Sequence, residues 1–403
     1  MKILISSLQV SHGSSKGHLH PAIEIALALK QRGHEVALLP LPCNFSASDL
    51  AQINRCEIKV ITPPPLPAGL PLSAEQLGKL VKSVETTHLA FESFLVSPLQ
   101  HQFSSILRTI SEFNPDIVVY DLLVYAAPLA ARILNIKDVG YCAGLKLIAP
   151  ASLTGIYQTT AAKLAPQISG FLKEINVSAD FHQLELLSTT HQMVFAADEF
   201  IGARNHPDPA GTILMGPLPV SMLRTVIPDQ NLLIKAQGAV VVCFGSVFDP
   251  ANYPRITEII IKVTRQFGRH LIIASEKLSN IHSEDITVTP YLPLPDLMTH
   301  AAILIHHGGA NTFSEALALG ARQILIPLAT DQPIQGEYLR HCQSGITIHP
   351  EEITEEILQD AFRQLLDPDN EIHHHIRKNR MLYQNGNGAK NAAILIEKTA
   401  QQD

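Results

Sequence analysis

The chain has 403 residues, of which 46% are apolar and 17% are charged, a composition typical of globular proteins. This length exceeds what one hydrophobic core usually holds, so we expect two domains. The net charge of −7 comes without a cluster of Lys and Arg, which argues against nucleic acid and against anionic membrane surfaces as partners.

The five cysteines are scattered along the chain without a CxxC pair, which favours a reduced compartment. The first ten residues, MKILISSLQV, hold one Lys and a brief apolar run, which indicates a first strand rather than a signal peptide. No apolar run reaches the roughly 18 residues that a membrane-spanning helix needs. We therefore expect a cytoplasmic protein with no transmembrane segment.

Short apolar runs alternate with helical patterns through the first half of the chain. Strands are indicated at 2–6, 35–41, 116–123 and 138–144, and helices at 20–33 and 126–134. The alternation predicts a parallel sheet covered by helices. Residues 62–73 are rich in Pro, and residues 147–172 are apolar without clear signals for the ends of helices or strands. We therefore expect both stretches to be weakly ordered.

The same alternation restarts after residue 230. Strands are indicated at 239–246, 270–275, 303–307 and 322–328, and helices at 257–268 and 311–320. The sequence therefore predicts two doubly wound halves in series. We place a first domain at 1–220, a linker at 221–231, a second domain at 232–380 and a last helix at 381–403.

Residues 291–333 contain the polar positions that point to a binding site. The strand ILIHH ends at a Gly-Gly turn, and a helix follows whose free N–H groups and small residues can bind an anion. His307 stands at the carboxyl end of this strand, where ligands bind in open α/β sheets. Glu315 lies one turn into the helix, where its carboxylate can accept hydrogen bonds from ribose hydroxyls. Asp331 and Gln332 follow the next strand at the same edge.

The spacing of these residues resembles, position by position, the donor-binding signature of family-1 glycosyltransferases with the GT-B fold. The matched positions are His307, Gly309, Asn311, Thr312, Glu315, Asp331 and Gln332. The resemblance implies an α/β protein with two doubly wound, Rossmann-like domains that face each other across a cleft. It also implies that His307 and Thr312 hold a diphosphate and that Glu315 holds a ribose. Asp331 and Gln332 would hold the sugar hydroxyls.

Further positions of the second half bear on the nucleotide. Gly245-Ser246, at the end of a strand, resembles the phosphate-contacting turn of the family, and Tyr291 falls where the family stacks an aromatic ring on the base. The family often carries Gln three residues after that ring, but this chain has Leu294, so uracil and thymine both stay open. The chain has no Trp, in contrast to plant members of the family, and it looks like the bacterial natural-product branch.

The stretch SHGSSKGHLHP at 11–21 allows several interpretations. GSSKG has the G-x-S-x-G form of a serine-hydrolase elbow, but Ser15 comes several residues after the strand rather than at its end. A phosphate loop does not fit, because Lys16 is followed by Gly. Zinc would find only histidines at usable spacing, without an acidic or Cys partner. These histidines are His12, His18 and His20. We interpret the run His373-His374-His375 as a solvated helix edge rather than as a set of metal ligands.

Residues 17–29, GHLHPAIEIALAL, resemble the GH-x-x-P segment that opens the first helix of the family. On that match His18 is the catalytic base, and Asp121, in a later strand, is the carboxylate that orients it. Asp116 at the start of that strand is a weaker candidate. We interpret His12 and His20 as structural, and we assign no chemistry to Ser14, Ser15 and Lys16.

The resemblance implies an inverting, metal-independent transfer of a hexose from a UDP- or TDP-sugar to a hydroxyl group. The nucleotide sugar is a co-substrate, and no further cofactor is expected. Residues 45–110 and 145–215, which would line the acceptor pocket, are apolar, so we expect a hydrophobic natural product, phenolic or lipid-like acceptor. We expect a monomer or a homodimer. A nucleotide-sugar epimerase or a non-catalytic sugar-nucleotide-binding protein of the same fold is the alternative, and neither needs His18 with Asp121.

Overall fold

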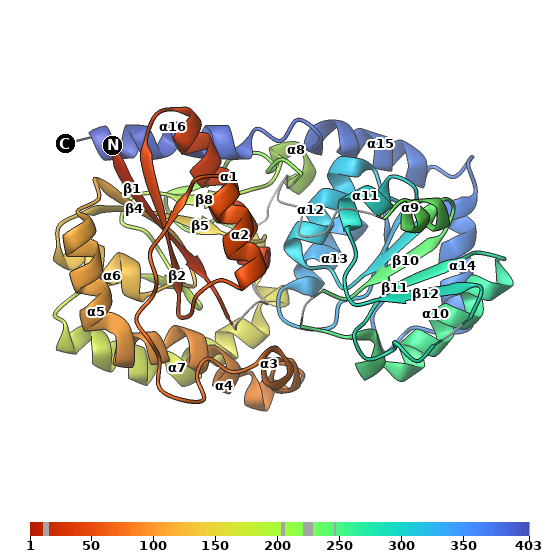
Figure 1. The fold of residues 1–403 in the computed structure, drawn as a ribbon, viewed down its shortest axis with the longest axis horizontal. Helices are drawn as coiled ribbons and strands as arrows, with labels where there is room; N and C mark the ends of the chain where they lie inside the picture. Colours follow the sequence, from red (N-terminus) through yellow and green to blue (C-terminus); the bar gives the residue numbers. More distant parts are fainter. Residues whose placement is uncertain (11–15, 203–205, 221–228, 246, 282, 403) are drawn as a thin grey trace. The chain divides into compact units, whose positions relative to one another are not determined.

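The structure is a computed structural model that describes residues 1–10, 16–202, 206–220, 229–245, 247–281 and 283–402. It consists of two compact units, each built around its own parallel sheet (Figure 1). The N-terminal unit comprises Met1–Asp198, Gly202–Leu218 and Asn387–Asp403, and the C-terminal unit comprises Glu199–Ile201 and Pro219–Gly386. The prediction of two doubly wound halves is confirmed.

The N-terminal unit contains a seven-stranded sheet in the order β3-β2-β1-β4-β5-β8-β9, in which all neighbouring strands run parallel. Its strands are β1 (Lys2–Leu8), β2 (Glu35–Leu41), β3 (Lys59–Val60), β4 (Ile117–Asp121), β5 (Lys137–Cys142), β8 (Gln192–Val194) and β9 (Thr212–Leu214). The central strands β1 and β4 are almost fully buried, as expected of strands covered on both faces. The strand order reverses between β1 and β4, and ligands of such sheets bind beside this reversal.

Helices flank this sheet, and the last helix of the chain belongs to the same unit (Figure 1). The helices are α1 (Lys16–Gln31), α2 (Ala47–Arg55), α3 (Ala74–Leu80), α4 (Val84–Leu95), α5 (Ser97–Phe113), α6 (Ala126–Ile133), α7 (Gly155–Glu174) and α16 (Gly388–Gln401). α16 packs against α1. At this contact Arg32 donates two hydrogen bonds to the Glu397 carboxylate, at 2.7 and 2.6 Å, and His34 Nε2 lies 2.6 Å from Glu397 Oε1.

The expectation that residues 147–172 are weakly ordered is wrong. Two short 3-10 turns, Lys146–Ile148 and Ala151–Leu153, lead into the 20-residue helix α7. The buried positions of α7 are Tyr157, Thr160, Leu164 and Ile168, spaced by three or four residues. This narrow stripe is the signature of an amphipathic helix, but small and polar residues between its members conceal it in the composition.

The C-terminal unit contains a six-stranded sheet in the order β12-β11-β10-β13-β14-β15, again parallel throughout. Its strands are β10 (Val240–Cys243), β11 (Leu271–Ala274), β12 (Ile286–Thr289), β13 (Ile303–His306), β14 (Gln323–Leu325) and β15 (Ile346–Thr347). Both sheets therefore share one topology, in which the strand order reverses beside the first strand. In this unit the reversal lies between β10 and β13.

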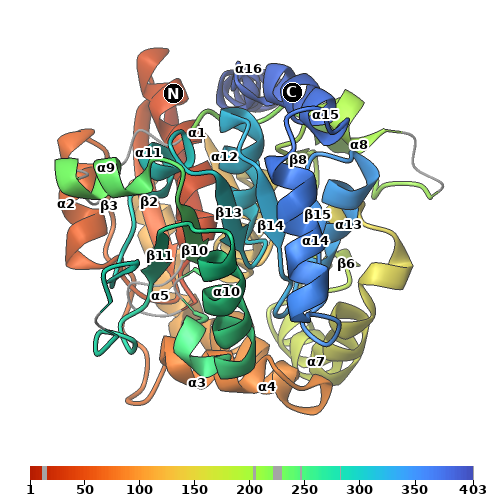
Figure 2. The same cartoon turned by 90° about the vertical axis from the view of Figure 1, so that its right-hand side faces the viewer.

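Most helices of the C-terminal unit lie between successive strands, although β11 leads to β12 without a helix. The helices are α9 (Gln230–Ala236), α10 (Pro254–Gln266), α11 (Leu294–Met298), α12 (Ala310–Leu319), α13 (Gln332–His341), α14 (Glu355–Leu366) and α15 (Ile372–Tyr383). Figure 2 shows α10 and α14 side by side over one face of the sheet. On α12, Phe313 packs within 5.9 Å of the ring of Phe200, which comes from the four-residue helix α8 (Asp198–Ile201). Phe200 thus holds the short segment Glu199–Ile201 in the C-terminal unit.

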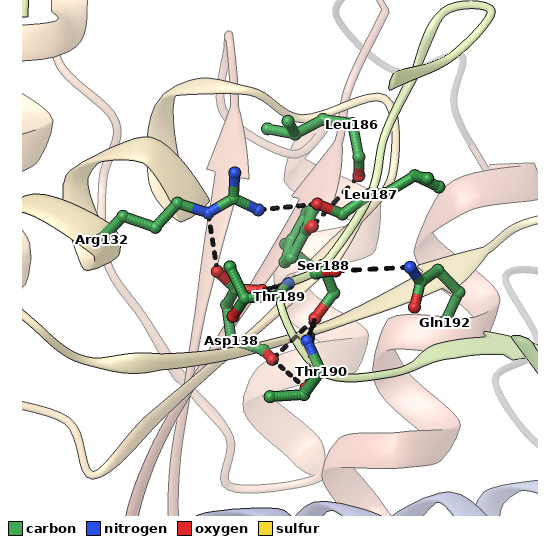
Figure 3. Close-up of polar contacts among 9 residues, drawn as sticks. Arg132, Asp138, Leu186, Leu187, Ser188, Thr189, Thr190 and Gln192 are labelled. Carbon is green, nitrogen blue, oxygen red and sulfur yellow. Dashed lines mark hydrogen bonds and ion pairs between the residues drawn. The ribbon is translucent and has the colours of Figure 1, made fainter. Parts of the chain in front are cut away.

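A buried ion pair fixes the segment that leads into β8 (Figure 3). Arg132 Nε donates to Asp138 Oδ2 at 2.9 Å, and Arg132 Nη2 donates to the Leu187 carbonyl at 2.7 Å. The N–H group of Thr189 donates to Asp138 Oδ1 at 2.9 Å. Since both carboxylate oxygens are paired, the buried charge is compensated. The network holds the hairpin of β6 (Phe181–His182) and β7 (Glu185–Leu186) beside the end of β4, where the Leu186 N–H group donates to the carbonyl of Leu122, the residue after β4.

The run of three histidines at 373–375 is only partly the solvated edge that its sequence predicts. His374 is exposed, but His373 is buried and its Nε2 lies 2.9 Å from the Asp367 carbonyl. His373 belongs to the inward stripe of α15, next to Ile372 and Ile376. None of the helices in the described part of the chain is both long and apolar enough to cross a membrane.

Candidate active site

In both sheets the residues predicted for function gather at the carboxyl ends of the strands. His18 and Asp121 belong to the β1–β4 reversal of the N-terminal unit. Gly245 and His307 follow β10 and β13 at the reversal of the C-terminal unit. Because all strands of a sheet are parallel, these side chains share one edge with the loops after the neighbouring strands.

His18 and Asp121 form a direct pair. His18 is the third residue of α1, and its Nδ1 lies 2.6 Å from Oδ2 of Asp121, the last residue of β4. The side chain of His18 is 25% exposed, whereas that of Asp121 is only 2% exposed. The imidazole therefore has one edge against a buried carboxylate and another edge open to a ligand.

The surroundings of Asp121 determine which nitrogen of His18 carries the proton. Asp121 Oδ1 accepts from the Leu123 N–H group at 3.0 Å, so both carboxylate oxygens act as acceptors. His18 then donates from Nδ1, and its Nε2 keeps a lone pair. The Tyr141 hydroxyl donates to the His18 carbonyl at 3.4 Å. Burial, and then the charge of Asp121, hold the pKa of Tyr141 well above its usual value, so this hydroxyl stays a donor.

The other residues singled out near the first strand lie apart from this pair or outside the described residues. Asp116 is exposed at the opposite end of β4, where its carboxylate accepts from the Lys2 N–H group at 2.7 Å. His20 is buried on α1, with its Nδ1 3.8 Å from Glu24 Oε1. His12, Ser14, Ser15 and the donor-binding candidate Ser246 lie outside the described residues, as does the side chain of Lys16.

His307 occupies a cradle made by two glycines. A Cβ atom added to Gly245 would lie 2.7 Å from His307 Cε1, and one added to Gly309 would lie 2.7 Å from His307 Nε2. Gly245 also has a φ of +80°, which side chains rarely tolerate. The ring of Phe248 lies 6.0 Å from the imidazole. The sequence predicts these glycines as donor-binding residues, and the structure places both of them in contact with His307.

The cradle makes His307 a weak base. Burial lowers its pKa to about 4, although the charge of Asp331 and the backbone at Cys243 act in the opposite direction. Its Nδ1 is buried and has no hydrogen-bond partner among the residues that the structure describes. His307 is therefore neutral near pH 7 and can donate a hydrogen bond without carrying a charge.

The start of α12 leaves backbone donors free of helical partners. The helix begins at Ala310, Gly309 is its N-cap residue, and no side chain of the described residues caps it. The first helical bond joins the Phe313 N–H group to the Gly309 carbonyl, so the preceding N–H groups of the first turn are not used by the helix. Asn311, Thr312 and Glu315 lie half-buried on this first part of α12. Such a terminus attracts anions.

Asp331 is the N-cap of α13 and Gln332 its first residue, and hydrogen bonds hold both side chains. Gln332 is buried, and its Oε1 accepts from the N–H groups of Leu328 and Ala329 at 2.7 and 2.9 Å. Only the amide nitrogen of Gln332 is then left to meet a hydroxyl. Asp331 Oδ2 accepts from Gln335 Nε2 at 2.9 Å, which fixes the carboxylate at the helix start.

Tyr291 and Leu294 occupy different environments although they are three residues apart. Tyr291 follows β12 and is 42% exposed. Leu294 begins α11 and is buried in the core cluster that contains Leu297 and Met298. The position at which the family often carries a base-reading Gln is therefore part of the hydrophobic core here.

The segment predicted to be an apolar lining contains a buried ion pair. Lys146 Nζ lies 3.3 Å from Glu185 Oε1, and the two side chains are 7% and 1% exposed. The Cys142 thiol donates to the same oxygen at 3.3 Å. Lys146 also lies 4.8 Å from the centre of the Tyr157 ring. Residues 145–215 therefore combine apolar side chains with a compensated internal charge.

His306 and Gln323 are functional candidates that the sequence reasoning missed. His306 is fully buried, its Nδ1 accepts from the Gly308 N–H group at 3.2 Å, and its Nε2 lies 3.0 Å from Gln323 Oε1. The signal was the pair His306-His307 itself. Adjacent residues of a strand point to opposite sides, so one histidine of such a pair faces inward. Within the described residues, no group of three or more His, Cys, Asp or Glu side chains could hold a metal ion.

The chain is similar to known proteins, both over the C-terminal region that contains His307 and over most of its length. A family model described as the C-terminal domain of erythromycin biosynthesis protein CIII-like proteins matches residues 257–381. Aclacinomycin-T 2-deoxy-L-fucose transferase of Streptomyces galilaeus is 21% identical over 405 residues, covering 91% of this chain and 89% of the relative. Tylactone mycaminosyltransferase of Streptomyces fradiae is 21% identical over 420 residues, covering 92% and 86%.

Solved structures share the fold over the whole chain. The glycotransferase of kitacinnamycin has a TM-score of 0.73 at 19% identity and covers 99% of both chains. Glycosyltransferase VinC, solved in complex with DTDP, has a TM-score of 0.70 at 16% identity and covers 100% of both chains. At these identities the likeness establishes the fold alone. The GT-B fold shared with these structures, the family model and the near-full-length relatives support a nucleotide-sugar-dependent glycosyltransferase of the bacterial natural-product type.

Proposed function

We propose that this glycosyltransferase moves a hexose from a UDP- or TDP-sugar to a hydroxyl group of a hydrophobic small molecule, with inversion at the anomeric carbon and without a metal ion. His18 acts as the general base and Asp121 orients it. The observation that supports this proposal most directly is the 2.6 Å contact between His18 Nδ1 and Asp121 Oδ2. An epimerase or a sugar-nucleotide-binding protein of the same fold has no need for this pair.

The proposed reaction begins at the open nitrogen of His18. An acceptor hydroxyl is a weak nucleophile at neutral pH, and a base whose pKa lies near the working pH can remove its proton during attack. The hydroxyl proton moves to His18 Nε2, the acceptor oxygen bonds to the anomeric carbon, and the bond from that carbon to the diphosphate breaks. Asp121 stabilises the resulting imidazolium and keeps its ring oriented.

The leaving diphosphate would be held by the start of α12. The first N–H groups of α12 and the side chain of Thr312 offer donors, and His307 adds a neutral one. Gly245 and Ser246 complete this side in the proposal. Glu315 would bind the ribose, Asp331 with the amide nitrogen of Gln332 would bind the sugar, and Tyr291 would stack on the base. The complex of VinC with DTDP supports a nucleoside diphosphate as the ligand class.

The acceptor stays a hydrophobic small molecule in this proposal, because large parts of 45–110 and 145–215 are apolar. The relatives whose names contain aclacinomycin and tylactone support an acceptor of natural-product type. A panel of phenols and macrolactones offered with TDP- and UDP-hexoses tests this class directly.

The decisive experiment compares wild type with His18→Ala on such a panel. The variant should lose turnover by roughly 10²–10⁴-fold, the usual contribution of a general base, while its Kd for TDP or UDP stays the same. Unchanged kcat would reject the base assignment. Incubation of the donor alone provides a second check, because an epimerised donor without an acceptor would identify an epimerase. Loss of turnover in EDTA would contradict the metal-independent mechanism.

A further inference from the structure

His306 is enclosed on all sides at the carboxyl end of β13. Its side chain is fully buried, and its backbone pairs with Cys243 on one side and Leu325 on the other. Among the described residues its ring has two hydrogen-bond partners: the Gly308 N–H group, 3.2 Å from Nδ1, and Gln323 Oε1, 3.0 Å from Nε2. Burial, and then the nearby His307, lower its pKa to about 3, so the imidazole is neutral.

These two contacts allow a single arrangement of protons. A backbone N–H group can only donate, so Nδ1 of His306 must be an acceptor without a proton. The proton of the neutral ring then sits on Nε2 and needs an acceptor. Gln323 must therefore present its carbonyl oxygen rather than its amide nitrogen. The amide nitrogen of Gln323 is buried without a partner among the described residues, which is the cost of this orientation.

The peptide that His306 holds leads directly into α12. Gly308 has a φ of +90°, and a Cβ atom there would lie 2.9 Å from Leu325 Cδ2, so this position accepts only Gly. The next residue, Gly309, is the N-cap of α12 and contacts His307. A change in the Gly308 peptide would therefore move the first turn of α12 and the ring of His307 together.

We propose that His306, locked in its Nε2–H tautomer by Gln323, positions the Gly308 turn so that α12 and His307 bind the diphosphate of the donor. This inference rests on the proposed function, in which that turn receives the diphosphate. The opposite tautomer would place two donors, Nδ1–H and the Gly308 N–H group, against each other at 3.2 Å. His306 and Gln323 are positioning residues, because they act through the turn rather than by touching the donor.

Two matched pairs of variants test the roles of the two partners. His306→Asn provides a carbonyl oxygen for the Gly308 N–H group, whereas His306→Leu has a similar volume and no acceptor. Gln323→Glu keeps an acceptor for Nε2–H, whereas Gln323→Met removes it. The measurement is the Kd for TDP and for UDP by calorimetry, with the melting temperature recorded for each variant. We expect His306→Asn and Gln323→Glu to stay within about threefold of wild type and the other two to weaken binding by about tenfold or more.

A spectroscopic measurement on the unaltered protein tests the tautomer without relying on the affinity of any variant. Long-range proton–nitrogen correlations of histidine-labelled protein report which ring nitrogen carries the proton, and the His306→Asn spectrum identifies the His306 signals. A protonated Nδ1 would overturn the inference, as would wild-type affinity in His306→Leu. Failure of wild type to bind either nucleoside diphosphate would instead reject the donor site of the proposed function. In that case the tautomer measurement still decides whether Gln323 locks His306.

Discussion

In the N-terminal unit, the strands beside the order reversal bring an imidazole and a carboxylate together. His18 follows β1, and its Nδ1 lies 2.6 Å from Asp121 at the end of β4. In the C-terminal unit, the two corresponding strands bring an imidazole between two glycines. His307 follows β13 and is enclosed by Gly245 after β10 and by Gly309. One topology therefore holds a histidine against a negative charge in one unit and within a close-fitting cradle in the other.

The difference shows how the second partner decides the chemistry of a histidine. The Asp121 carboxylate accepts from Nδ1 of His18, so the lone pair of Nε2 is available to a ligand. Desolvation disfavours the charged form, so His307, whose pKa is lowered to about 4, stays a neutral donor. In the proposed function, a base and an anion-binding donor thus arise from the same strand order. The four predictions that follow test this contrast.

The largest expected effect is that of Asp121→Asn on turnover. The amide nitrogen of Asn can donate to His18 Nδ1, which would move the imidazole proton to Nε2 and remove the base. We expect kcat to fall by roughly 10²–10⁴-fold while the Kd for TDP changes by less than about twofold. Steady-state kinetics and calorimetry on the same preparation measure both. A parallel loss of TDP affinity would show that the two sites are not separable in this way.

The second prediction concerns acid stability. The pKa of His307 is about 4 in the folded chain and about 6.5 when it is unfolded, so the unfolded state binds more protons between these values. Stability should therefore fall as the pH drops from 6.5 to 4, by about 3 kcal/mol from His307 alone. Buried His306, with its lower pKa, acts in the same direction. Thermal unfolding between pH 7 and 4 measures this loss.

His307→Gln provides the control for the pH measurement, because it removes the titrating group and retains a hydrogen-bonding side chain. Its melting temperature should depend less on pH than that of wild type over the same range. An equally steep dependence in the variant would show that His307 is not the source of the acid sensitivity.

The third prediction tests the glycine cradle by a matched pair of substitutions. Gly309→Ala places a methyl group within 2.7 Å of His307 Nε2, so the ring must shift, and we expect TDP binding to weaken about tenfold. Gly17→Ala, beside His18 in the other unit, meets no described atom within 4 Å. This control should leave TDP binding unchanged. Equal Kd values for both variants would show that the close fit of Gly309 around His307 does not affect TDP binding.

The smallest expected effect is that of Tyr291→Ala. The exposed ring of Tyr291 would stack on the base, and the loss of one partly exposed stacking contact weakens binding by about fivefold. Tyr291→Phe keeps the ring face and should bind TDP and UDP as wild type does. If both variants lose affinity equally, the hydroxyl group of Tyr291 makes the contribution. If neither loses affinity, Tyr291 does not contribute to nucleotide binding.

Much of the fold could be predicted from local patterns. The strand at 35–41 and the helix stop at Gly33 follow from apolar periodicity and from a residue that tolerates a φ of +86°. Helix α7 could not be predicted in this way, because its buried stripe is narrow and interrupted by small residues. Its helical structure depends on burial of Tyr157 and Leu164 against other elements, which no short window of sequence contains.

The candidate site, like the fold, could be predicted only in part from the sequence. The spacing from His307 to Gln332 predicts a donor-binding signature, yet it could not show that Gln332 uses its carbonyl oxygen to hold the Leu328 and Ala329 N–H groups. Nor could it show that Gly309 makes room for a histidine ring. Roles of this kind depend on which atom of a side chain is already occupied.

The sequence by itself determined the class of the protein, because alternating apolar runs and motif spacing are properties of neighbouring residues. It placed His18, Asp121 and His307 at strand ends, where parallel sheets bind ligands. Only the tertiary structure decided what each histidine can do. His18 meets a carboxylate 103 residues away, and His306 meets an amide 17 residues away. Protonation depends on burial and on partners in space, and these are fixed only when distant segments pack together.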